Sequence, residues 1–258
     1  MAEADSRNLS DAHTEAPSLR GRRVLITGGT TGIGRAVAIL LASQGAKVFV
    51  CGRTPEHLND ALERIREVGE GDGINVDLTR QEDIERFVAE GERYLGGIDV
   101  AVINAAVAVN TLEETDTGYI RYTLDTNLTA FVETAKLATD RMKAGSDVVF
   151  IGSMSSVTQE KGSSVYVAAK TGVEGFATAL RKELAEKDIK VGIIMPGKTG
   201  ADIHYPNICP PEQRELIHQD KLLRAEDIAV AAHYMLTQPR RTVVSMIHVE
   251  PRIAEPQE

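Results

Sequence analysis

The sequence predicts a doubly wound α/β domain: one parallel sheet of about seven strands, with helices on both of its faces. Two observations predict this fold. Short runs rich in Val and Ile alternate with amphipathic stretches, and the short runs are apolar throughout. Alternation of strands and helices is typical of right-handed βαβ units. Strands without a polar side suit a parallel sheet that is covered on both faces.

The elements can be placed in order from these patterns. The expected strands are 24–27, 47–51, 73–77, 100–104, 148–153, 190–195 and 243–249. The expected helices are 33–43, 55–68, 81–94, 115–143, 163–186 and 225–236, with a short helical piece near 212–218. No linker or change of composition divides the series, so we expect a single domain over residues 18–258.

Two segments lie outside this regular series. Residues 1–17 have no periodic apolar pattern, and we expect a flexible arm there. Residues 198–224 are irregular and contain several prolines, which late in an α/β domain is typical of a functional loop. We expect this interval to form a substrate lid. Its His204, Tyr205 and Ile208 are candidate substrate contacts, although packing within the loop explains them as well.

Composition excludes several classes of protein. The chain has 258 residues, of which 42% are hydrophobic and 26% charged, as in ordinary globular proteins. The net charge of −9 argues against broad binding to nucleic acid or an anionic membrane. No apolar run approaches the roughly 20 residues of a membrane helix, and the polar N-terminus is unlike a signal peptide. Cys51 and Cys209 form no C-x-x-C motif, which favours a reducing, cytoplasmic location.

A glycine-rich turn follows the first expected strand. Gly28, Gly32 and Gly34 have the spacing G-x-x-x-G-x-G. Glycine permits a tight turn and close approach of a phosphate to the backbone, and the N-terminus of the following helix faces that phosphate. A glycine-rich turn can also end a strand for steric reasons alone. The strand–turn–helix setting favours a nucleotide pyrophosphate site.

The end of the second expected strand indicates which dinucleotide binds. An NAD site usually places Asp or Glu there, on the ribose 2′-hydroxyl. This chain has Cys51-Gly52-Arg53 and no acid. The glycine leaves space, and the planar cation of Arg53 suits a 2′-phosphate. We therefore expect NADP(H). NAD(H) is the alternative if Arg53 is only a solvated surface residue, and Arg35 is a second candidate for the phosphate.

A catalytic pair is expected on the helix 163–186. Tyr166 and Lys170 lie four residues apart and share one helix face. A free tyrosine titrates near ~10, and a neighbouring cation lowers that pKa, so the pair suits proton donation to a carbonyl that becomes an alcohol. A surface tyrosine packed on a lysine stem explains the same spacing.

A serine at the carboxyl end of an expected strand completes this candidate site. Ser153 could hold the substrate oxygen beside Tyr166, because parallel sheets keep their ligands at that edge. A serine at a strand end or a helix cap is also common. Ser155 and Ser156 follow closely, so the sequence leaves the assignment among the three open.

Together these residues resemble the short-chain dehydrogenase/reductase family, in its single-domain branch that prefers NADP. The resemblance covers about residues 19–251 and implies a Rossmann-type fold. The matching pieces are the glycine turn 27–34, Asp77, Asn104-Ala105, Asn127, Ser153, the Y-x-x-x-K of 166–170 and Pro196-Gly197. Their order and spacing are much more specific together than any one motif is alone.

The resemblance implies an enzyme that transfers hydride between a nicotinamide and a carbonyl or alcohol of a small molecule. It implies Tyr166 as the acid in reduction and the base in oxidation. Lys170 would lower the pKa of Tyr166 and bind the nicotinamide ribose, and Ser153 would orient the carbonyl. Asn127 would support a water-linked proton relay, although it could simply cap or kink a helix. From NADP use we expect reduction of a ketone or aldehyde.

The resemblance also implies the cofactor contacts. Asp77 would contact the adenine, although it could be a turn residue, and Asn104 and Ala105 would line the adenine ribose. The full set of expected cofactor contacts is Gly28, Thr30, Thr31, Gly32, Ile33, Gly34, Arg53, Asp77, Leu78, Asn104, Ala105, Ala106, Tyr166, Lys170, Pro196, Gly197 and Thr199.

Two positions depart from the family pattern. Ala106 stands where the family usually has glycine, and its methyl group would lie near the path of the cofactor. Ala201 stands where the family often keeps a threonine, although Thr199 is nearer to Gly197. More loosely, the stretch 223–251 resembles NADP-linked reductases of small hydroxy acids, sugar alcohols or aldehydes.

The same residues also bear on alternative functions and on the assembly. A non-catalytic NADP-binding sensor or partner protein would not need the set Ser153–Tyr166–Lys170, and NAD-linked alcohol oxidation is opposed by Arg53. The six dispersed histidines lack metal-ligand spacing, and no G-x-S-x-G motif marks a serine hydrolase. The family usually pairs its two longest helices across subunits, which implies a homodimer or homotetramer through 115–143 and 163–186.

Overall fold

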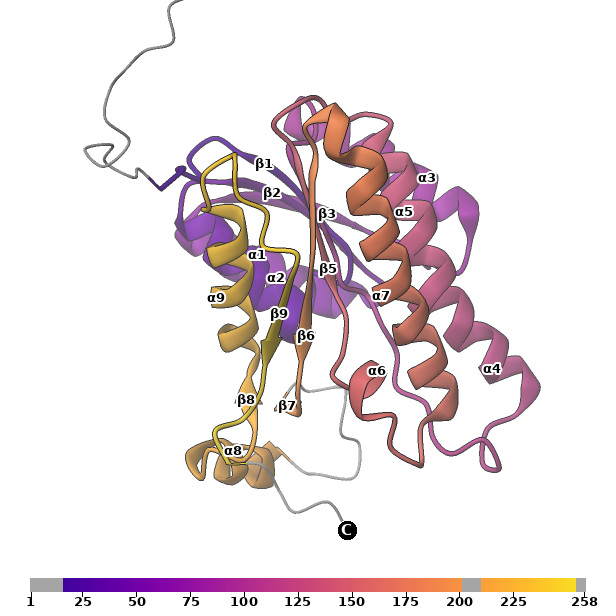
Figure 1. Ribbon diagram of the computed structural model, residues 1–258. Coiled ribbons are helices and arrows are strands. Elements are labelled where there is room, and N and C mark those ends of the chain that lie inside the picture. The colour runs from indigo at the N-terminus through magenta and orange to yellow at the C-terminus, as the bar shows by residue number, and fades with distance from the viewer. Residues whose placement is uncertain (1–15, 201–209, 254–258) are drawn as a thin grey trace, which may run out of the picture.

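A single seven-stranded parallel sheet forms the centre of the molecule (Figure 1). The structure, a computed structural model, describes residues 16–200 and 210–253. The strand order is β3-β2-β1-β4-β5-β6-β9. The strands are β1 (Arg23–Ile26), β2 (Lys47–Gly52), β3 (Glu70–Asn75), β4 (Val100–Ile103), β5 (Asp147–Ile151), β6 (Lys190–Pro196) and β9 (Met246–Val249). The predicted Rossmann-like α/β fold is confirmed.

Helices cover both faces of this sheet, as Figure 1 shows. On one face, an apolar core joins the sheet to α1 (Gly32–Ser43), α2 (Pro55–Val68) and α9 (Ala225–Leu236). On the other face, a second core joins it to α3 (Gln81–Leu95), α5 (Ala130–Thr139) and α7 (Ser164–Leu184). The strands β1, β4 and β5 are buried almost throughout. Each helix buries one apolar stripe, which fixes the carboxyl ends of the strands relative to one another.

The third strand was predicted at 73–77 and begins earlier, at Glu70. Its glycines explain the difference, because they lack the β-branched signal of a strand and yet pack closely on β2. A Cβ on Gly71 would lie 2.7 Å from Val48 Cγ2, and a Cβ on Gly73 would lie 2.4 Å from the Val50 carbonyl oxygen. Strand pairing with β2 therefore overrides the low β-propensity of this segment.

The long helix predicted at 115–143 is divided into three parts. These are α4 (Thr117–Leu124), a π-helix (Asp125–Thr129) and α5, which ends at Thr139. A π-helical turn inserts one residue into the helical repeat and is frequent at functional sites. The last strand is also shorter than the predicted 243–249.

The expected substrate lid is described only in part. Of residues 198–224, the structure describes 198–200 and 210–224, so His204, Tyr205, Ile208 and Ala201 lie outside the described residues, as does most of the expected arm 1–17. The described part forms a two-stranded ribbon, β7 (Thr199–Gly200) with β8 (Leu223–Arg224), and helix α8 (Pro210–His218). Among the described helices, none is both long and apolar enough to span a membrane.

The topology places the site. The chain moves outward from β1 to β2 and β3, and then returns to β4 on the other side of β1. Connections that leave in opposite directions open a crevice at the carboxyl ends of the two strands, which is where such folds bind ligands.

Candidate active site

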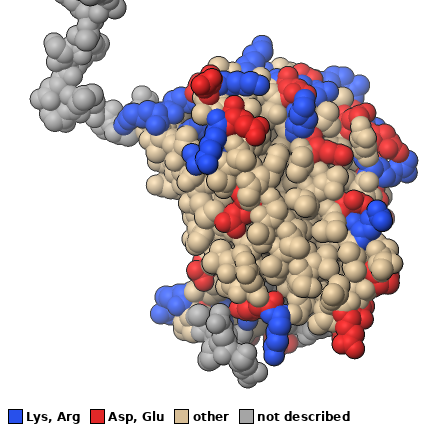
Figure 2. Space-filling model, turned by 45° about the vertical axis from the view of Figure 1, so that its right-hand side comes forward, with Lys and Arg blue, Asp and Glu red and all other residues tan. Residues whose placement is uncertain are grey.

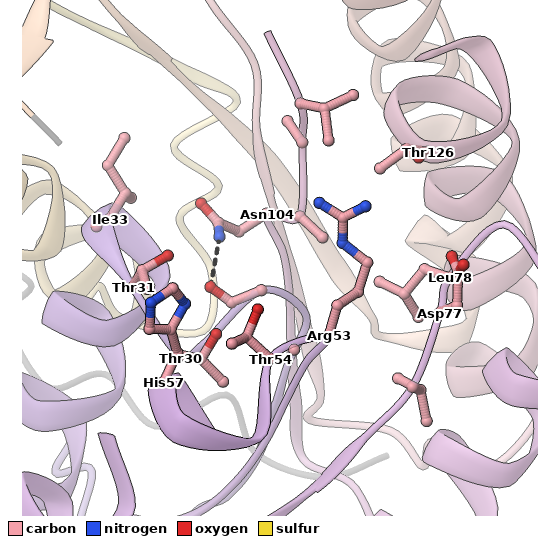
Figure 3. A pocket seen from close by; sticks show the side chains of 17 residues that line it. Thr30, Thr31, Ile33, Arg53, Thr54, His57, Asp77, Leu78, Asn104 and Thr126 are labelled. Carbon is pink, nitrogen blue, oxygen red and sulfur yellow. Dashed lines mark hydrogen bonds between the residues drawn. The ribbon is translucent and has the colours of Figure 1, made fainter. Parts of the chain in front are cut away.

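A cleft opens at the carboxyl ends of β1, β2 and β4 and is shown in Figure 3. It holds about 910 Å³ of space, its open mouth included. Its predicted lining residues are Gly28, Thr30, Thr31, Gly32, Ile33, Arg53, Asp77, Leu78, Asn104, Ala105 and Ala106. Six further residues line it: Gly52, Thr54, His57, Val76, Val107 and Thr126.

The glycine turn brings α1 into close contact with the end of β1. Gly28 and Gly32 have positive φ angles of 63° and 50°, which favour glycine. A Cβ on Gly34 would lie only 2.2 Å from the Gly28 carbonyl oxygen, so Gly34 serves helix packing and is not among the residues that line the cleft. The N-cap Thr31 makes no side-chain capping bond. The first turn of α1 therefore offers uncapped N–H groups to the cleft, as a pyrophosphate requires.

Asn104 holds the glycine turn against β4. Its side-chain Nδ2 donates to the carbonyl oxygens of Thr27 and Gly28, both at 3.2 Å, and Figure 3 shows it at the centre of the cleft. Its backbone N–H donates to Thr27 Oγ1 at 2.9 Å. Asn104 was predicted to line the adenine ribose. It does line the cleft, but its amide is engaged with the backbone of the turn.

Asp77 lies further along the same wall and forms a local turn. Its Oδ1 accepts hydrogen bonds from the backbone N–H and the hydroxyl of Thr79, at 3.1 and 2.8 Å. Its own N–H donates to Asp83 Oδ2 at 2.8 Å, and this bond lowers the pKa of Asp83. Asp77 is thus both a turn residue and a lining residue of the cleft.

The two candidate arginines have different environments. Arg35 forms an ion pair with Asp60 at 2.7 Å. Arg53 is exposed, and among the described residues no carboxylate pairs with it. Its side chain reaches from the end of β2 across the cleft toward Thr126 (Figure 3). A Cβ on Gly52 would lie 2.3 Å from Thr30 Oγ1, so glycine at this position lets the Thr30 side chain pack against the end of β2.

The N-terminus of α2 borders the same end of the cleft, through Thr54 and His57. Sequence reasoning missed both residues. Thr54-Pro55 is a helix-start signal that follows Arg53 directly, and it could have indicated that the first turn of α2 belongs to this site.

Ser153, Tyr166 and Lys170 lie around the carboxyl end of β5. Lys170 Nζ donates to the Ile151 carbonyl oxygen at 3.0 Å, and this bond ties α7 to the last residue of β5. The same Nζ lies 5.7 Å from the centre of the Tyr166 ring. Ser153 follows Ile151 by two residues. The structure therefore brings the three predicted catalytic side chains to one corner of the sheet.

Hydrogen bonds distinguish the three neighbouring serines. The Ser156 hydroxyl is buried and bonded to Glu174 at 2.6 Å and to the Ser153 carbonyl at 3.0 Å. Ser153 Oγ accepts the Ser155 N–H at 3.1 Å and lies 3.0 Å from Ser155 Oγ. Ser153 and Ser155 thus form one hydroxyl pair, while Ser156 faces α7.

Lys170 is the most strongly perturbed group of this site. Only 1% of its surface is exposed, and the Phe131 ring lies 4.6 Å from Nζ. Burial lowers its pKa from 10.5 to about 7. No carboxylate within the described ranges forms an ion pair with it to offset the desolvation. A buried amine that titrates near neutral pH is typical of a functional site.

Comparisons with known proteins agree with this geometry. Residues 22–207 match the family model described as short chain dehydrogenase. The chain belongs to the short-chain dehydrogenase/reductase family. It is 31% identical, over 90% of its length and 98% of the relative, to an uncharacterized oxidoreductase of Staphylococcus aureus strain MRSA252. It is 33% identical to the NADPH-dependent aldehyde reductase 1 of Arabidopsis thaliana, over 76% of this chain and 72% of that protein.

Solved structures of the family show the same fold. A dehydrogenase/reductase from Sinorhizobium meliloti 1021 superposes with a TM-score of 0.81 at 26% identity, covering 90% of this chain and 94% of the other. A short chain dehydrogenase from Burkholderia cenocepacia J2315, solved in complex with NADP, gives 0.80 at 24% identity, covering 91% and 98%. As a member of the short-chain dehydrogenase/reductase family, the chain is an oxidoreductase that uses a nicotinamide cofactor.

Asn127, the fourth residue that the family pattern marks as catalytic, lies in the π-helix and is fully buried. Both polar atoms of its side chain bond to the backbone of Val107, which lines the cleft. These two hydrogen bonds therefore connect the π-helix to the loop after β4. Any proton relay at this dehydrogenase site remains a proposal.

Pro196 is the last residue of β6, and Gly197 and Thr199 follow it. None of the three is among the lining residues of the cleft. The Met154 N–H donates to the Pro196 carbonyl at 2.9 Å, which places this segment beside the serine loop. The Thr199 hydroxyl is buried and donates to the Gly197 carbonyl at 3.0 Å. This internal bond leaves the contact between Thr199 and a cofactor phosphate as an expectation.

Proposed function

We propose that the protein is an NADP(H)-dependent carbonyl reductase that acts on a small ketone or aldehyde, with Tyr166 as its acid. The observation that carries the proposal is the environment of Lys170: a buried amine on the same helix face as Tyr166, hydrogen-bonded to the strand that leads to Ser153. A pattern of this kind suits proton transfer to an oxygen that gains negative charge.

Each of the three side chains would have its own role in the proton transfer. Ser153 donates a hydrogen bond to the carbonyl oxygen and orients it. Tyr166 transfers its phenolic proton to that oxygen as the alcohol forms, and the positive charge of Lys170 stabilises the resulting phenolate. Lys170 Nζ donates one N–H to the Ile151 carbonyl oxygen, and its two other N–H donors can bind other partners. The bound nicotinamide supplies the hydride.

The cofactor would lie along the cleft, and its residues fit the group. The glycine turn and the uncapped start of α1 suit the pyrophosphate. At the far end, no carboxylate of the described residues pairs with the positive charge of Arg53, which supports a 2′-phosphate and hence NADP(H). The name of the Arabidopsis relative supports both this cofactor and an aldehyde as substrate.

A second copy of the chain is the proposed partner. Figure 2 shows that the centre of the face formed by α5 and α7 carries few charged side chains. Along α7, Ala168, Gly175 and Ala179 are exposed and Gly172 is half-buried, at a spacing that permits close helix approach. Ala169, the neighbour of Ala168, is buried and packs toward the sheet. These small residues support pairing of the long helices across subunits.

Tyr166→Phe tests the proposed chemistry. We expect turnover of a panel of ketones and aldehydes, followed as NADPH consumption, to fall by at least about 100-fold, the usual range for loss of a general acid. Binding of NADPH, followed by fluorescence of the nicotinamide, should be retained. A variant that keeps most of its turnover would overturn the role of Tyr166. A wild type that binds NADPH but reduces no member of the panel would favour the sensor alternative.

A further inference from the structure

Arg53 contacts an aromatic ring from a distant part of the chain. Its guanidinium carbon lies 5.4 Å from the centre of the Tyr122 ring. Tyr122 belongs to α4, whereas Arg53 follows β2, so the contact joins the end of β2 to the helix that leads into the π-helix, whose Thr126 lines the cleft. Asp77, the acid that lines this cleft, is bonded to Thr79 and does not pair with the arginine.

Several contacts fix the Tyr122 ring. It packs against the Tyr119 ring at a centroid distance of 5.5 Å. The Tyr119 hydroxyl in turn donates to the Ala108 carbonyl at 2.9 Å, which anchors that ring to the loop after β4. On the next helical turn, the Thr126 hydroxyl donates to the Tyr122 carbonyl at 2.9 Å, and Thr126 lines the cleft. Arg53 therefore contacts a ring whose position is set before any ligand binds.

The geometry of a guanidinium makes this contact compatible with anion binding. Stacking on a ring uses the flat face of the group, while the N–H donors point outward from its edge. A free arginine loses rotamer freedom when it binds a phosphate, and an arginine that is already held loses less. The ring should therefore favour, and not oppose, the capture of a phosphate by Arg53.

We propose that Tyr122 is a positioning residue for Arg53 and thereby contributes to selection of an adenosine that carries a 2′-phosphate. The inference rests on the proposed use of NADP(H). An exposed cation–π contact corresponds to about a two- to fivefold change in an equilibrium constant, and we expect an effect of that size on affinity.

The test measures nucleotide binding to the full-length protein by calorimetry, with 2′,5′-ADP and 5′-AMP as probes. Tyr122→Leu should weaken 2′,5′-ADP binding about two- to fivefold and leave 5′-AMP binding unchanged. Tyr122→Phe should restore the wild-type affinities, because the buried Tyr122 hydroxyl makes no hydrogen bond among the described residues. The matched control is Tyr234→Leu, at a half-exposed tyrosine on α9, which should change neither affinity.

If Tyr122→Leu does not fold, variants with fluorinated phenylalanines at position 122 provide a second test. They preserve the size of the ring while they weaken its negative face. The affinity for 2′,5′-ADP should fall as fluorine atoms are added, and the affinity for 5′-AMP should stay constant.

Arg53→Leu separates the two proposals. If this variant leaves the preference for 2′,5′-ADP intact, Arg53 does not read the 2′-phosphate, and the inference about Tyr122 fails while the proposed use of NADP(H) stands. If the wild type itself does not prefer 2′,5′-ADP over 5′-AMP, the proposed use of NADP(H) is wrong. If Arg53→Leu abolishes the preference, Tyr122→Leu should have no further effect in the Arg53→Leu background. The inference about Tyr122 requires that Tyr122→Leu alone reduce the preference that Arg53→Leu abolishes. It is overturned if Tyr122→Leu leaves the preference for 2′,5′-ADP unchanged, increases it, or weakens the binding of both nucleotides equally.

Discussion

The side-chain amide of Asn127 forms two hydrogen bonds with the backbone of Val107. Its Oδ1 accepts the Val107 N–H at 2.8 Å, and its Nδ2 donates to the Val107 carbonyl at 2.8 Å. The pair joins the π-helix to the loop that lines the cofactor cleft. Asn127 thus shapes the wall of the cleft, whatever else it does during turnover.

Replacing this amide should affect both stability and binding. Asn127→Leu keeps the size of the side chain but leaves two buried backbone groups of Val107 without partners, each at a cost of about 1–3 kcal/mol. We expect the free energy of unfolding in urea to fall by about 2–4 kcal/mol and NADPH binding to weaken. Thr129→Ala, at an exposed residue of the same π-helix, is the control and should change neither. A stable Asn127→Leu protein with normal affinity would contradict the assignment.

The buried Lys170 should make the cofactor-free protein more stable in mild alkali. Its folded pKa of about 7 lies below the ordinary value of 10.5. Between these values the unfolded chain holds a proton that the folded chain has released, so the free energy of unfolding rises with pH, by up to about 1.4 kcal/mol per pH unit. Lys170→Met removes this contribution.

Urea titrations of both proteins at pH 7 and pH 9 measure the effect. Relative to Lys170→Met, the wild type should gain about 2 kcal/mol over this interval. The comparison cancels the titration of all other groups that the substitution leaves unchanged. Equal pH slopes for the two proteins would show that Lys170 keeps its ordinary pKa in the fold.

The glycine turn offers a second stability test, with a matched pair of helical glycines. A Cβ at Gly34 would lie 2.2 Å from a backbone oxygen, whereas a Cβ at Gly175 would meet nothing within 4 Å. Gly34→Ala should therefore lose roughly 3 kcal/mol or more of stability and bind NADPH at least about tenfold more weakly. In the monomeric protein, Gly175→Ala should be neutral or up to about 1 kcal/mol more stable, because alanine favours a helix. Equal effects of the two substitutions would be incompatible with the packing seen at the turn.

The Cys51 thiol should be unreactive in the folded protein. It is fully buried in β2, and burial raises the pKa of its thiol to about 12. In a Cys209→Ser background, titration with a thiol-specific disulfide reagent should detect no thiol before denaturation and one thiol afterwards. Rapid labelling of the native protein would mean that β2 opens readily.

Much of the site follows from local patterns. The glycine spacing before α1, the four-residue interval between Tyr166 and Lys170, and the absence of an acid beside Arg53 are all read within a few residues of one another. Each depends on a short-range rule of turns, helix periodicity or charge. Most of the expected strands that are rich in Val and Ile agree with the structure to within two residues at each end, although β9 begins only at Met246. The prediction fails at β3, where Gly71 and Gly73 form a strand only because β2 lies beside them.

By itself, the sequence determined the class of fold and named the candidate cofactor turn and the candidate catalytic side chains, because their signals are local. Tertiary structure alone decided what surrounds them. The desolvation of Lys170 arises from Phe131 and the β5 backbone, and the role of Asn127 arises from its bonds to Val107. The contact between Arg53 and Tyr122 exists only because the fold brings α4 close to the end of β2. These properties depend on packing between distant segments, which sets burial and distance and therefore the pKa values and contacts of the site.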